Sequence, residues 1–169
     1  MSERYSRALA FCMAAHAAVG QVRKYTGEPY AVHPIAVAGL VRTYVPNASE
    51  AMLVAALLHD VVEDTQVTLE LVAAQFGLLV AAYVDELTDV SKPEDGNRAV
   101  RKAIDLAHTA QASPAAKTIK LADLLHNTSS IRTYDPEFAK VYLVEKRALL
   151  EVLTEGDPTL YRMAVEAAQ

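Results

Sequence analysis

AALLHDVVED, residues 55–64, places one histidine and three carboxylates in a stretch that is otherwise aliphatic. An α-helix turns by about 100° per residue, so Glu63 is expected about 40° around the helix from His59, and Asp64 about 40° from Asp60. The four polar side chains then fit within an arc of roughly 140°, and their aliphatic neighbours place that arc at the edge of a core. Carboxylates gathered there repel one another and are costly to desolvate unless a cation joins them. The stretch therefore predicts a helix that carries a metal site.

Helix start and stop signals punctuate the rest of the chain. Asn47 is expected to cap the helix that contains this stretch, with Glu50 at the capping-box position. Further helices are expected at about 6–23, 33–44, 68–77, 78–88 and 97–111, and after the cap-and-proline pairs at 113–114, 135–136 and 157–158. No segment has the pattern of a strand. The predicted fold is all-α: a single compact domain over residues 1–169, built as a bundle of about eight or nine helices.

Composition limits the classes of protein that fit. The 169 residues are 52% hydrophobic and 22% charged, which is typical of a globular protein. A net charge of −5 argues against a general nucleic-acid binder, because that function needs a broad basic face. The chain has no charged-then-apolar leader and no apolar run long enough to span a bilayer, so no membrane partner is expected. The lone Cys12 indicates a reducing compartment, and we expect a soluble, cytoplasmic protein.

Four residues make a suitable ligand set for one divalent ion: His33, His59, Asp60 and Asp123. Two imidazoles and two carboxylates suit Mn²⁺, Fe²⁺ or Zn²⁺, and a single cysteine excludes an all-sulfur site. Each histidine alone is more often a surface or core residue than a ligand. Their arrangement as His, His-Asp and Asp on three separate expected helices is much more specific, and it favours a metal site.

Glu63 and Asp64 stand one turn beyond the expected ligands. In one interpretation they hold and deprotonate an attacking water. In the other they are a solvated pair at a helix C-terminus, where carboxylates oppose the helix dipole and need a positive partner. A metal ion supplies that partner, so the catalytic interpretation is favoured.

Several weaker signals allow two interpretations each. Lys117 and Lys120 face either a polyphosphate or solvent, and His16 is either functional or a packed, hydrogen-bonded histidine. Tyr30 flanks either a nucleobase or, as we favour, only the turn in which it lies. Residues 90–97 are the most loop-like stretch of the chain and a candidate lid or rim over a site.

Four stretches of the sequence resemble the HD superfamily of metal-dependent phosphohydrolases, and more closely the alarmone hydrolase domain of RelA/SpoT-type proteins. They are RKYTGEPYAVHP at 23–34, AALLHDVVEDT at 55–65, FG at 76–77 and KLADLLHN at 120–127. Their order and spacing are far more specific than an isolated His-Asp pair. The length leaves no room for the synthetase or regulatory domains of long members, so the chain resembles the stand-alone small alarmone hydrolases.

The resemblance implies a role for each matching residue. His33, His59, Asp60 and Asp123 match ligands of one Mn²⁺ ion, and Glu63 with Asp64 matches the pair that activates the attacking water. The residues implied to bind substrate are Arg23 and Lys24 in the nucleotide pocket, Asn127 near the ribose, and Tyr142 and Lys146 in the segment that closes the pocket.

The activity implied by the resemblance is hydrolysis of the 3′-pyrophosphate of a small nucleotide alarmone, (p)ppGpp or (p)ppApp, with release of pyrophosphate. Guanine or adenine preference and the oligomeric state stay open. Two rival functions are an HD-type phosphohydrolase for nucleoside monophosphates, dNTPs or cyclic nucleotides, and a non-catalytic nucleotide sensor. Generic HD members do not need the stretch at 23–30, and a sensor could lose Glu63 and Asp64 without penalty, so the alarmone hydrolase is favoured.

Overall fold

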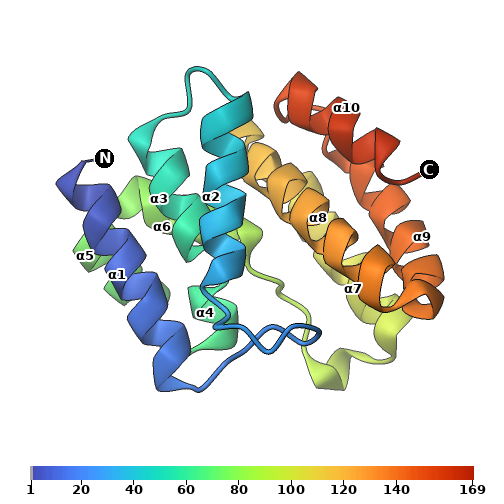
Figure 1. Cartoon of the computed structure of the whole chain (residues 1–169), viewed down its shortest axis with the longest axis horizontal. Coiled ribbons are helices and arrows are strands. Elements are labelled where there is room, and N and C mark those ends of the chain that lie inside the picture. The colour runs from blue at the N-terminus through green and yellow to red at the C-terminus, as the bar shows by residue number, and fades with distance from the viewer. Residues whose placement is uncertain (1) are drawn as a thin grey trace. The chain divides into compact units, whose positions relative to one another are not determined.

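The computed structural model describes residues 2–169, and the regular structure in that range is helical apart from one isolated bridge between Val22 and Pro29 (Figure 1). The predicted all-α class is confirmed. The elements are α1 Glu3–Ala18, α2 Val32–Tyr44, α3 Glu50–Leu58, α4 Val61–Asp64, α5 Leu69–Phe76, α6 Leu78–Leu87, the 3₁₀ turn η1 Pro93–Asp95, α7 Arg98–Ala110, α8 Pro114–Tyr134, α9 Pro136–Val152 and α10 Pro158–Glu166.

The chain divides into two compact units. The N-terminal unit ends at Thr88 and contains α1 to α6, and the C-terminal unit, Asp89–Gln169, contains η1 and α7 to α10. That residues 1–169 form a single domain stays a prediction.

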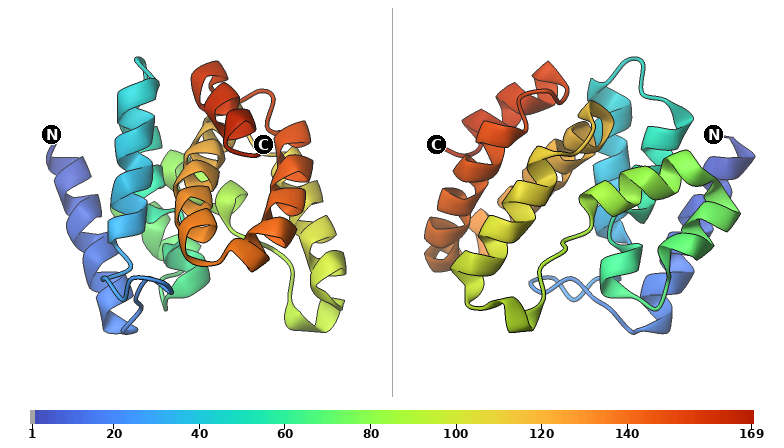
Figure 2. Two further views of the ribbon diagram at one scale, coloured as in Figure 1. Left: turned by 45° about the vertical axis from the view of Figure 1, so that its right-hand side comes forward. Right: turned by 180° about the vertical axis from the view of Figure 1, so that it is seen from behind.

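Helix α3 is the centre of the N-terminal unit, where it packs against α1, α2 and α6 (Figure 2). All five side chains from Val54 to Leu58 are fully buried. Each leucine or valine buried in this way contributes roughly 1.5–3 kcal/mol to folding. The aliphatic run therefore forms the predicted core, and His59 and Asp60 follow at its end.

The helix predicted from Asn47 starts later than expected. Ser49 is the cap of α3, since its Oγ accepts from the Met52 N–H at 3.2 Å. Asn47 lies instead in the turn that begins at Pro46. The prediction of the cap was wrong because serine caps a helix as well as asparagine does, and Ser49 stands closer to the apolar run.

The same helix is interrupted at His59 and Asp60, and the single turn α4 follows. Asp60 has φ −100° and ψ −4°, in the sparsely populated bridge region where many active-site residues lie. The Asp64 N–H still bonds to the Asp60 carbonyl at 2.9 Å, so the acidic pair stays one turn beyond the expected ligands. In a one-turn helix the first and last turns coincide. The expectation that Glu63 and Asp64 oppose a helix dipole therefore no longer supports a positive partner for them. The interruption also adds one helix to the number expected.

Helix α1 ends before the predicted Arg23. Gly20 adopts the left-handed conformation with φ 66°, and its N–H bonds to the Ala17 carbonyl at 3.0 Å. The Gln21 N–H bonds to the His16 carbonyl at 3.1 Å. These two bonds make a Schellman motif, which ends the helix and directs the chain back across its last turn.

In the C-terminal unit α8 packs against α9 and α10, and α7 packs against α9 (Figure 2). The three predicted cap-and-proline starts are confirmed, because Ser113, Asp135 and Asp157 each accept a hydrogen bond from a backbone N–H of the first turn. Lys117 is buried in α8 and pairs with Glu155. The alternative that Lys117 faces solvent was therefore wrong, because its side chain is buried, and a role in binding polyphosphate stays a prediction.

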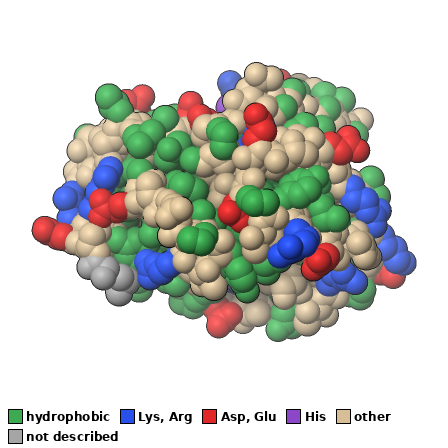
Figure 3. Space-filling model, turned by 90° about the horizontal axis from the view of Figure 1, so that it is seen from above, with side chains coloured by type: hydrophobic (Ala, Val, Ile, Leu, Met, Phe, Trp, Pro, Cys, Tyr) green, Lys and Arg blue, Asp and Glu red, His purple; other side chains and the backbone are tan. Residues whose placement is uncertain are grey.

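None of the described helices combines the length and the apolar character that crossing a bilayer requires. On the face of the molecule in Figure 3, Lys and Arg side chains lie in small groups beside acidic and apolar ones. Among the described residues visible there, no broad basic surface of the kind that nucleic acid requires is present.

Candidate functional site

Three predicted metal ligands converge in the N-terminal unit. His33 lies in the first turn of α2, and His59 and Asp60 form the break between α3 and α4. One ligand atom from each residue lies within 4.8 Å of the other two. Both imidazoles are buried, while Asp60 is partly exposed. Two nitrogens and one oxygen facing a common point form a group that could hold a divalent ion.

Hydrogen bonding determines which ring nitrogen of His59 is available to a metal ion. Its Nδ1 donates to the Ala56 carbonyl at 2.9 Å, so Nδ1 carries a proton. Its Nε2 lies 3.1 Å from Asp60 Oδ2, and His33 Nε2 lies 3.6 Å from the same oxygen. With Nδ1 protonated, a neutral His59 turns the lone pair of Nε2 toward this carboxylate, which is unfavourable unless a proton or a metal ion joins them. The arrangement therefore fits a cation.

Tyr30 contacts the same carboxylate from the turn before α2. Its hydroxyl donates to Asp60 Oδ2 at 2.7 Å. Its ring lies against the His33 ring, with centroids 5.7 Å apart, and against the His16 ring at 4.8 Å. Tyr30 thus does more than pack the turn, because it holds a predicted ligand in position as outer partners of metal ligands do.

The acidic pair divides into two environments. Asp64 is partly buried, and its Oδ2 accepts a hydrogen bond from Gln21 Nε2 at 2.9 Å. Glu63 is exposed. Gln21 in turn contacts His16 Nδ1 through its Oε1 at 2.6 Å. The catalytic role of the pair stays a prediction, but its two members differ in exposure.

The turn before α2 also presents the two basic residues predicted for the substrate. The Arg23 guanidinium lies 5.7 Å from the centroid of the Tyr30 ring. Lys24 is exposed, and its Nζ lies 4.8 Å from the centroid of the Tyr25 ring. Arg23 therefore lies beside the tyrosine that holds Asp60, while its contact with a phosphate stays a prediction.

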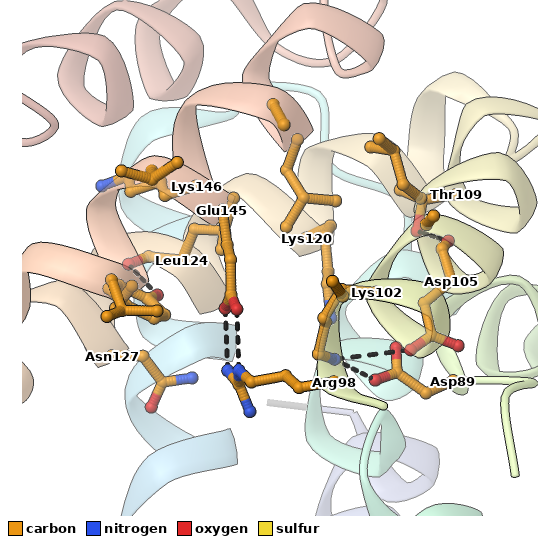
Figure 4. A pocket seen from close by; sticks show the side chains of 18 of the residues that line it. Asp89, Arg98, Lys102, Asp105, Thr109, Lys120, Leu124, Asn127, Glu145 and Lys146 are labelled. Atoms are coloured by element: carbon orange, nitrogen blue, oxygen red, sulfur yellow. Dashed lines mark hydrogen bonds and ion pairs between the residues drawn. The ribbon is translucent and has the colours of Figure 1, made fainter. Parts of the chain in front are cut away.

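The C-terminal unit contains a cavity of about 770 Å³ lined by α7, α8 and α9 (Figure 4). Four of the residues predicted as metal ligands or substrate-binding residues line it: Asp123, Asn127, Tyr142 and Lys146. This volume lies in the range of small-molecule sites. The structure thus brings together the C-terminal members of the predicted site. Because Asp123 belongs to this unit, its place as the fourth metal ligand stays a prediction.

Asp123 is buried in the wall of this cavity. Its Oδ1 accepts a hydrogen bond from Asn127 Nδ2 at 2.6 Å, and its Oδ2 lies 3.3 Å from Lys120 Nζ. These contacts fix the orientation of the Asp123 carboxylate. Lys120, whose role the sequence left open, is a partner of the predicted ligand.

Ion pairs that the sequence analysis missed line the same cavity (Figure 4). Arg98 donates two hydrogen bonds to Glu145, each of 2.7 Å. Lys102 Nζ lies 2.7 Å from Asp89 and 3.4 Å from Asp105. No local pattern marks Arg98, since its partner is 47 residues away. Only the pair of Lys102 with Asp105 has a local signal in the sequence, because the two residues stand about one helical turn apart.

The loop at 90–97 is anchored to α7 by Asp105. The Asp105 Oδ1 accepts from the Val90 N–H at 3.1 Å and from the Ser91 N–H at 2.9 Å. Asp89 and Arg98, which flank the loop, line the cavity. This position supports the rim interpretation, and a lid function stays a prediction.

Lys146 is a fully buried cation in the cavity wall. Its Nζ donates to Thr128 Oγ1 at 2.8 Å. Burial, with a smaller contribution from the charge of Arg132, lowers the pKa of Lys146 to about 8. Burial also raises the pKa of Tyr142, helped by the charge of Asp123. Such perturbed groups in a cavity are typical of functional sites.

A helical core that ends in a His-Asp pair, with a second histidine beside it, is the arrangement that defines an HD-type domain. Residues 8–149 match the HD domain family, and the chain belongs to that family.

Named relatives and a solved structure extend this assignment. The chain is 38% identical over 134 residues to the probable guanosine-3′,5′-bis(diphosphate) 3′-pyrophosphohydrolase of Synechocystis sp., covering 78% of this chain and 17% of that protein. It is 39% identical over 111 residues to the guanosine-3′,5′-bis(diphosphate) 3′-pyrophosphohydrolase MESH1 of Homo sapiens, covering 66% of this chain and 60% of that protein. In both cases the match spans less than two thirds of the relative's length.

The solved structure is that of a metazoan ortholog of SpoT that is described as hydrolysing ppGpp. It aligns with a TM-score of 0.88 at 30% identity, covering 99% of this chain and 94% of that one. The predicted likeness to RelA/SpoT-type proteins is confirmed.

Proposed function

We propose that this HD domain protein is a metal-dependent hydrolase that removes the 3′-pyrophosphate from nucleoside 5′,3′-polyphosphates such as ppGpp or ppApp. The observation that carries the proposal is the convergence of His33, His59 and Asp60 within 4.8 Å, one turn before an acidic pair. The names of the relatives support the substrate class, because two of them are 3′-pyrophosphohydrolases of guanosine bis(diphosphate).

The proposed metal ligands are His33, His59 and Asp60, with Asp123 as the fourth on the strength of its sequence motif. Mn²⁺ is the proposed ion, since two imidazoles and two carboxylates form a mixed nitrogen and oxygen set that suits it. When bound, the ion would act as a Lewis acid toward the phosphoryl group and lower the pKa of a coordinated water. Asp60 keeps its orientation through the hydrogen bond from Tyr30.

The reaction consumes one water. The bond between the ribose 3′ oxygen and its phosphorus breaks, the water oxygen joins the released pyrophosphate, and the 3′ oxygen gains a proton. Asp64 and Glu63 would orient the water and accept its proton. The products are pyrophosphate and a nucleoside 5′-diphosphate or 5′-triphosphate.

The remaining side chains would bind the nucleotide. Arg23 and Lys24 would offset phosphate charge, and Asn127, Tyr142 and Lys146 would contact the nucleotide from the cavity of the C-terminal unit that they line. The cytoplasm is the proposed compartment, because Cys12 is a free, buried thiol and not part of a disulfide.

The test is to incubate the purified protein with Mn²⁺ and, separately, ppGpp, ppApp, dGTP and cyclic nucleotides, and to resolve the products by ion-exchange chromatography. We expect pyrophosphate from at least one alarmone and no turnover by a His59→Asn variant. Hydrolysis of dGTP or cyclic nucleotides alone would support the generic HD phosphohydrolase. Nucleotide binding without any turnover would support the sensor.

A further inference from the structure

We infer that Gln21 is a positioning residue for Asp64, and that His16 sets the orientation of Gln21. This inference rests on the proposed function, because it assigns Asp64 its place in the activation of water. Gln21 Nε2 lies 2.9 Å from Asp64 Oδ2, and Gln21 Oε1 lies 2.6 Å from His16 Nδ1. The three side chains form a continuous hydrogen-bonded series in the N-terminal unit.

The chemistry of these groups allows one direction for the hydrogen bonds. An ionised carboxylate only accepts, so the amide nitrogen of Gln21 must face Asp64 and donate to it. The amide oxygen then faces His16, and it can only accept, so His16 Nδ1 carries the proton. A flipped amide would place two donors against each other at His16 Nδ1 and two acceptors against each other at Asp64, so His16 holds the amide of Gln21 in this orientation together with Asp64.

The fold holds Gln21 from both sides of its backbone. Its N–H bonds to the His16 carbonyl at 3.1 Å through the Schellman motif that ends α1. Its carbonyl accepts from the Tyr30 N–H at 3.2 Å. Tyr30 is also the residue whose hydroxyl holds Asp60, so one turn positions both a predicted ligand and a predicted catalytic acid.

Holding one carboxylate oxygen has a consequence for the reaction. With Oδ2 fixed by Gln21, the side chain of Asp64 loses rotational freedom and keeps Oδ1 in one direction toward a water. Glu63, by contrast, is exposed. A small misplacement of a reacting group costs up to about 100-fold in rate. Gln21 is therefore expected to affect turnover much more than substrate or metal binding.

The decisive variant is Gln21→Met, which keeps the length of the side chain and removes both hydrogen bonds. We expect kcat for the alarmone to fall by about 10- to 100-fold, with KM and Mn²⁺ affinity within about threefold of wild type. The matched control is Gln75→Met, since Gln75 is an exposed glutamine of the same unit whose Oε1 contacts Arg7. This control should keep wild-type kcat.

His16 supplies a rescue experiment. In His16→Asn the amide nitrogen can replace Nδ1 as the donor to Gln21, whereas in His16→Leu no donor is present. We expect His16→Asn to retain most of the wild-type kcat and His16→Leu to lose it to the same extent as Gln21→Met. A purely structural role for His16 would predict that both variants lose thermal stability and activity together.

Two outcomes overturn the inference. One is a wild-type kcat in Gln21→Met, and the other is a fall in Mn²⁺ affinity that accounts for all the lost turnover. If the wild-type protein releases no pyrophosphate, the proposed function fails instead. The positioning claim is then decided by crystal structures of wild type and Gln21→Met with Mn²⁺. An Asp64 carboxylate that keeps its place in the variant contradicts it, and a rotated carboxylate supports it.

Discussion

The hydroxyl of Tyr30 donates a hydrogen bond to Asp60 Oδ2 at 2.7 Å, across 30 positions of the sequence. A donor to a metal-binding carboxylate fixes its orientation, and removal of such a partner typically costs about 10- to 100-fold in metal affinity. We therefore expect Tyr30→Phe to weaken Mn²⁺ binding by about that factor in titration calorimetry. Tyr25→Phe is the matched control from the same turn. Equal Mn²⁺ affinities in wild type and Tyr30→Phe would contradict this role.

Mn²⁺ is expected to stabilise the folded protein through its buried histidine ligands. A ligand at 100 times its Kd adds about 2.7 kcal/mol to the free energy of unfolding. Thermal unfolding of the wild type with and without Mn²⁺ should therefore show a clear rise in Tm, and chelation by EDTA should remove it. The rise should vanish in His59→Asn and persist in His108→Asn, a change on α7 outside the predicted ligand set. A persistent rise in His59→Asn would exclude this histidine as a ligand.

The acidic pair is expected to act in turnover rather than in metal binding. Asp64→Asn and Glu63→Gln remove the groups proposed to orient the water and accept its proton, and a general base contributes about 10²- to 10⁴-fold. We expect losses of that order in kcat, with Mn²⁺ still bound in calorimetry. Glu70→Gln, at an exposed acid on α5, should leave kcat unchanged. Full activity in both acidic-pair variants would remove the water-activating role.

Lys146 is expected to make the protein less stable at neutral pH. Its pKa is about 8 in the folded protein and near 10.5 in the unfolded chain. Between pH 8 and pH 10.5 the unfolded chain therefore binds more protons than the folded protein does. The destabilisation is complete below pH 8 and declines as the pH approaches 10.5. Lys146→Met should therefore raise the free energy of unfolding by about 2 kcal/mol at pH 7, and by less at pH 9.5.

Urea unfolding at both pH values checks this prediction. Lys140→Met is the control, because Lys140 is exposed on the same helix and pairs with Glu137. A Lys146→Met variant whose gain in stability does not shrink with rising pH would contradict the account. Loss of alarmone binding in that stabilised variant would indicate that the buried ammonium is retained for function.

Local signals in the sequence were sufficient for most of the helical fold. Three helices were predicted correctly from a capping residue, Ser113, Asp135 or Asp157, followed by a proline. Such a pair acts on the backbone within a few residues, so it can be recognised in the local sequence. The break at Asp60 could not be predicted in this way, since the apolar periodicity continues through Val61. The end of α1 was also placed too late, although Gly20 is the local signal for a Schellman motif.

The candidate site was predictable where its residues stand in short motifs. His33, His59 and Asp60 were predicted as ligands from the sequence, and their ligand atoms do converge. Gln21 was missed, and Tyr30 was assigned to packing of its turn, because their partners lie 43 and 30 positions away. A contact across that distance depends on how α1, α3 and the turn between α1 and α2 pack, and no single motif encodes it.

The most direct test of the central claim is a ³¹P NMR time course of ppGpp, and separately ppApp, incubated with the purified protein and Mn²⁺, in which each sample is quenched and freed of paramagnetic Mn²⁺ on a chelating resin before its spectrum is recorded. We expect the 3′-pyrophosphate resonances to disappear while free pyrophosphate and the nucleoside 5′-diphosphate appear in equal amounts. Asp64→Asn and EDTA-treated wild type should leave the spectra unchanged over the same period. Spectra that stay constant for both alarmones with the Mn²⁺-loaded wild type, or that show release of orthophosphate alone, would contradict it.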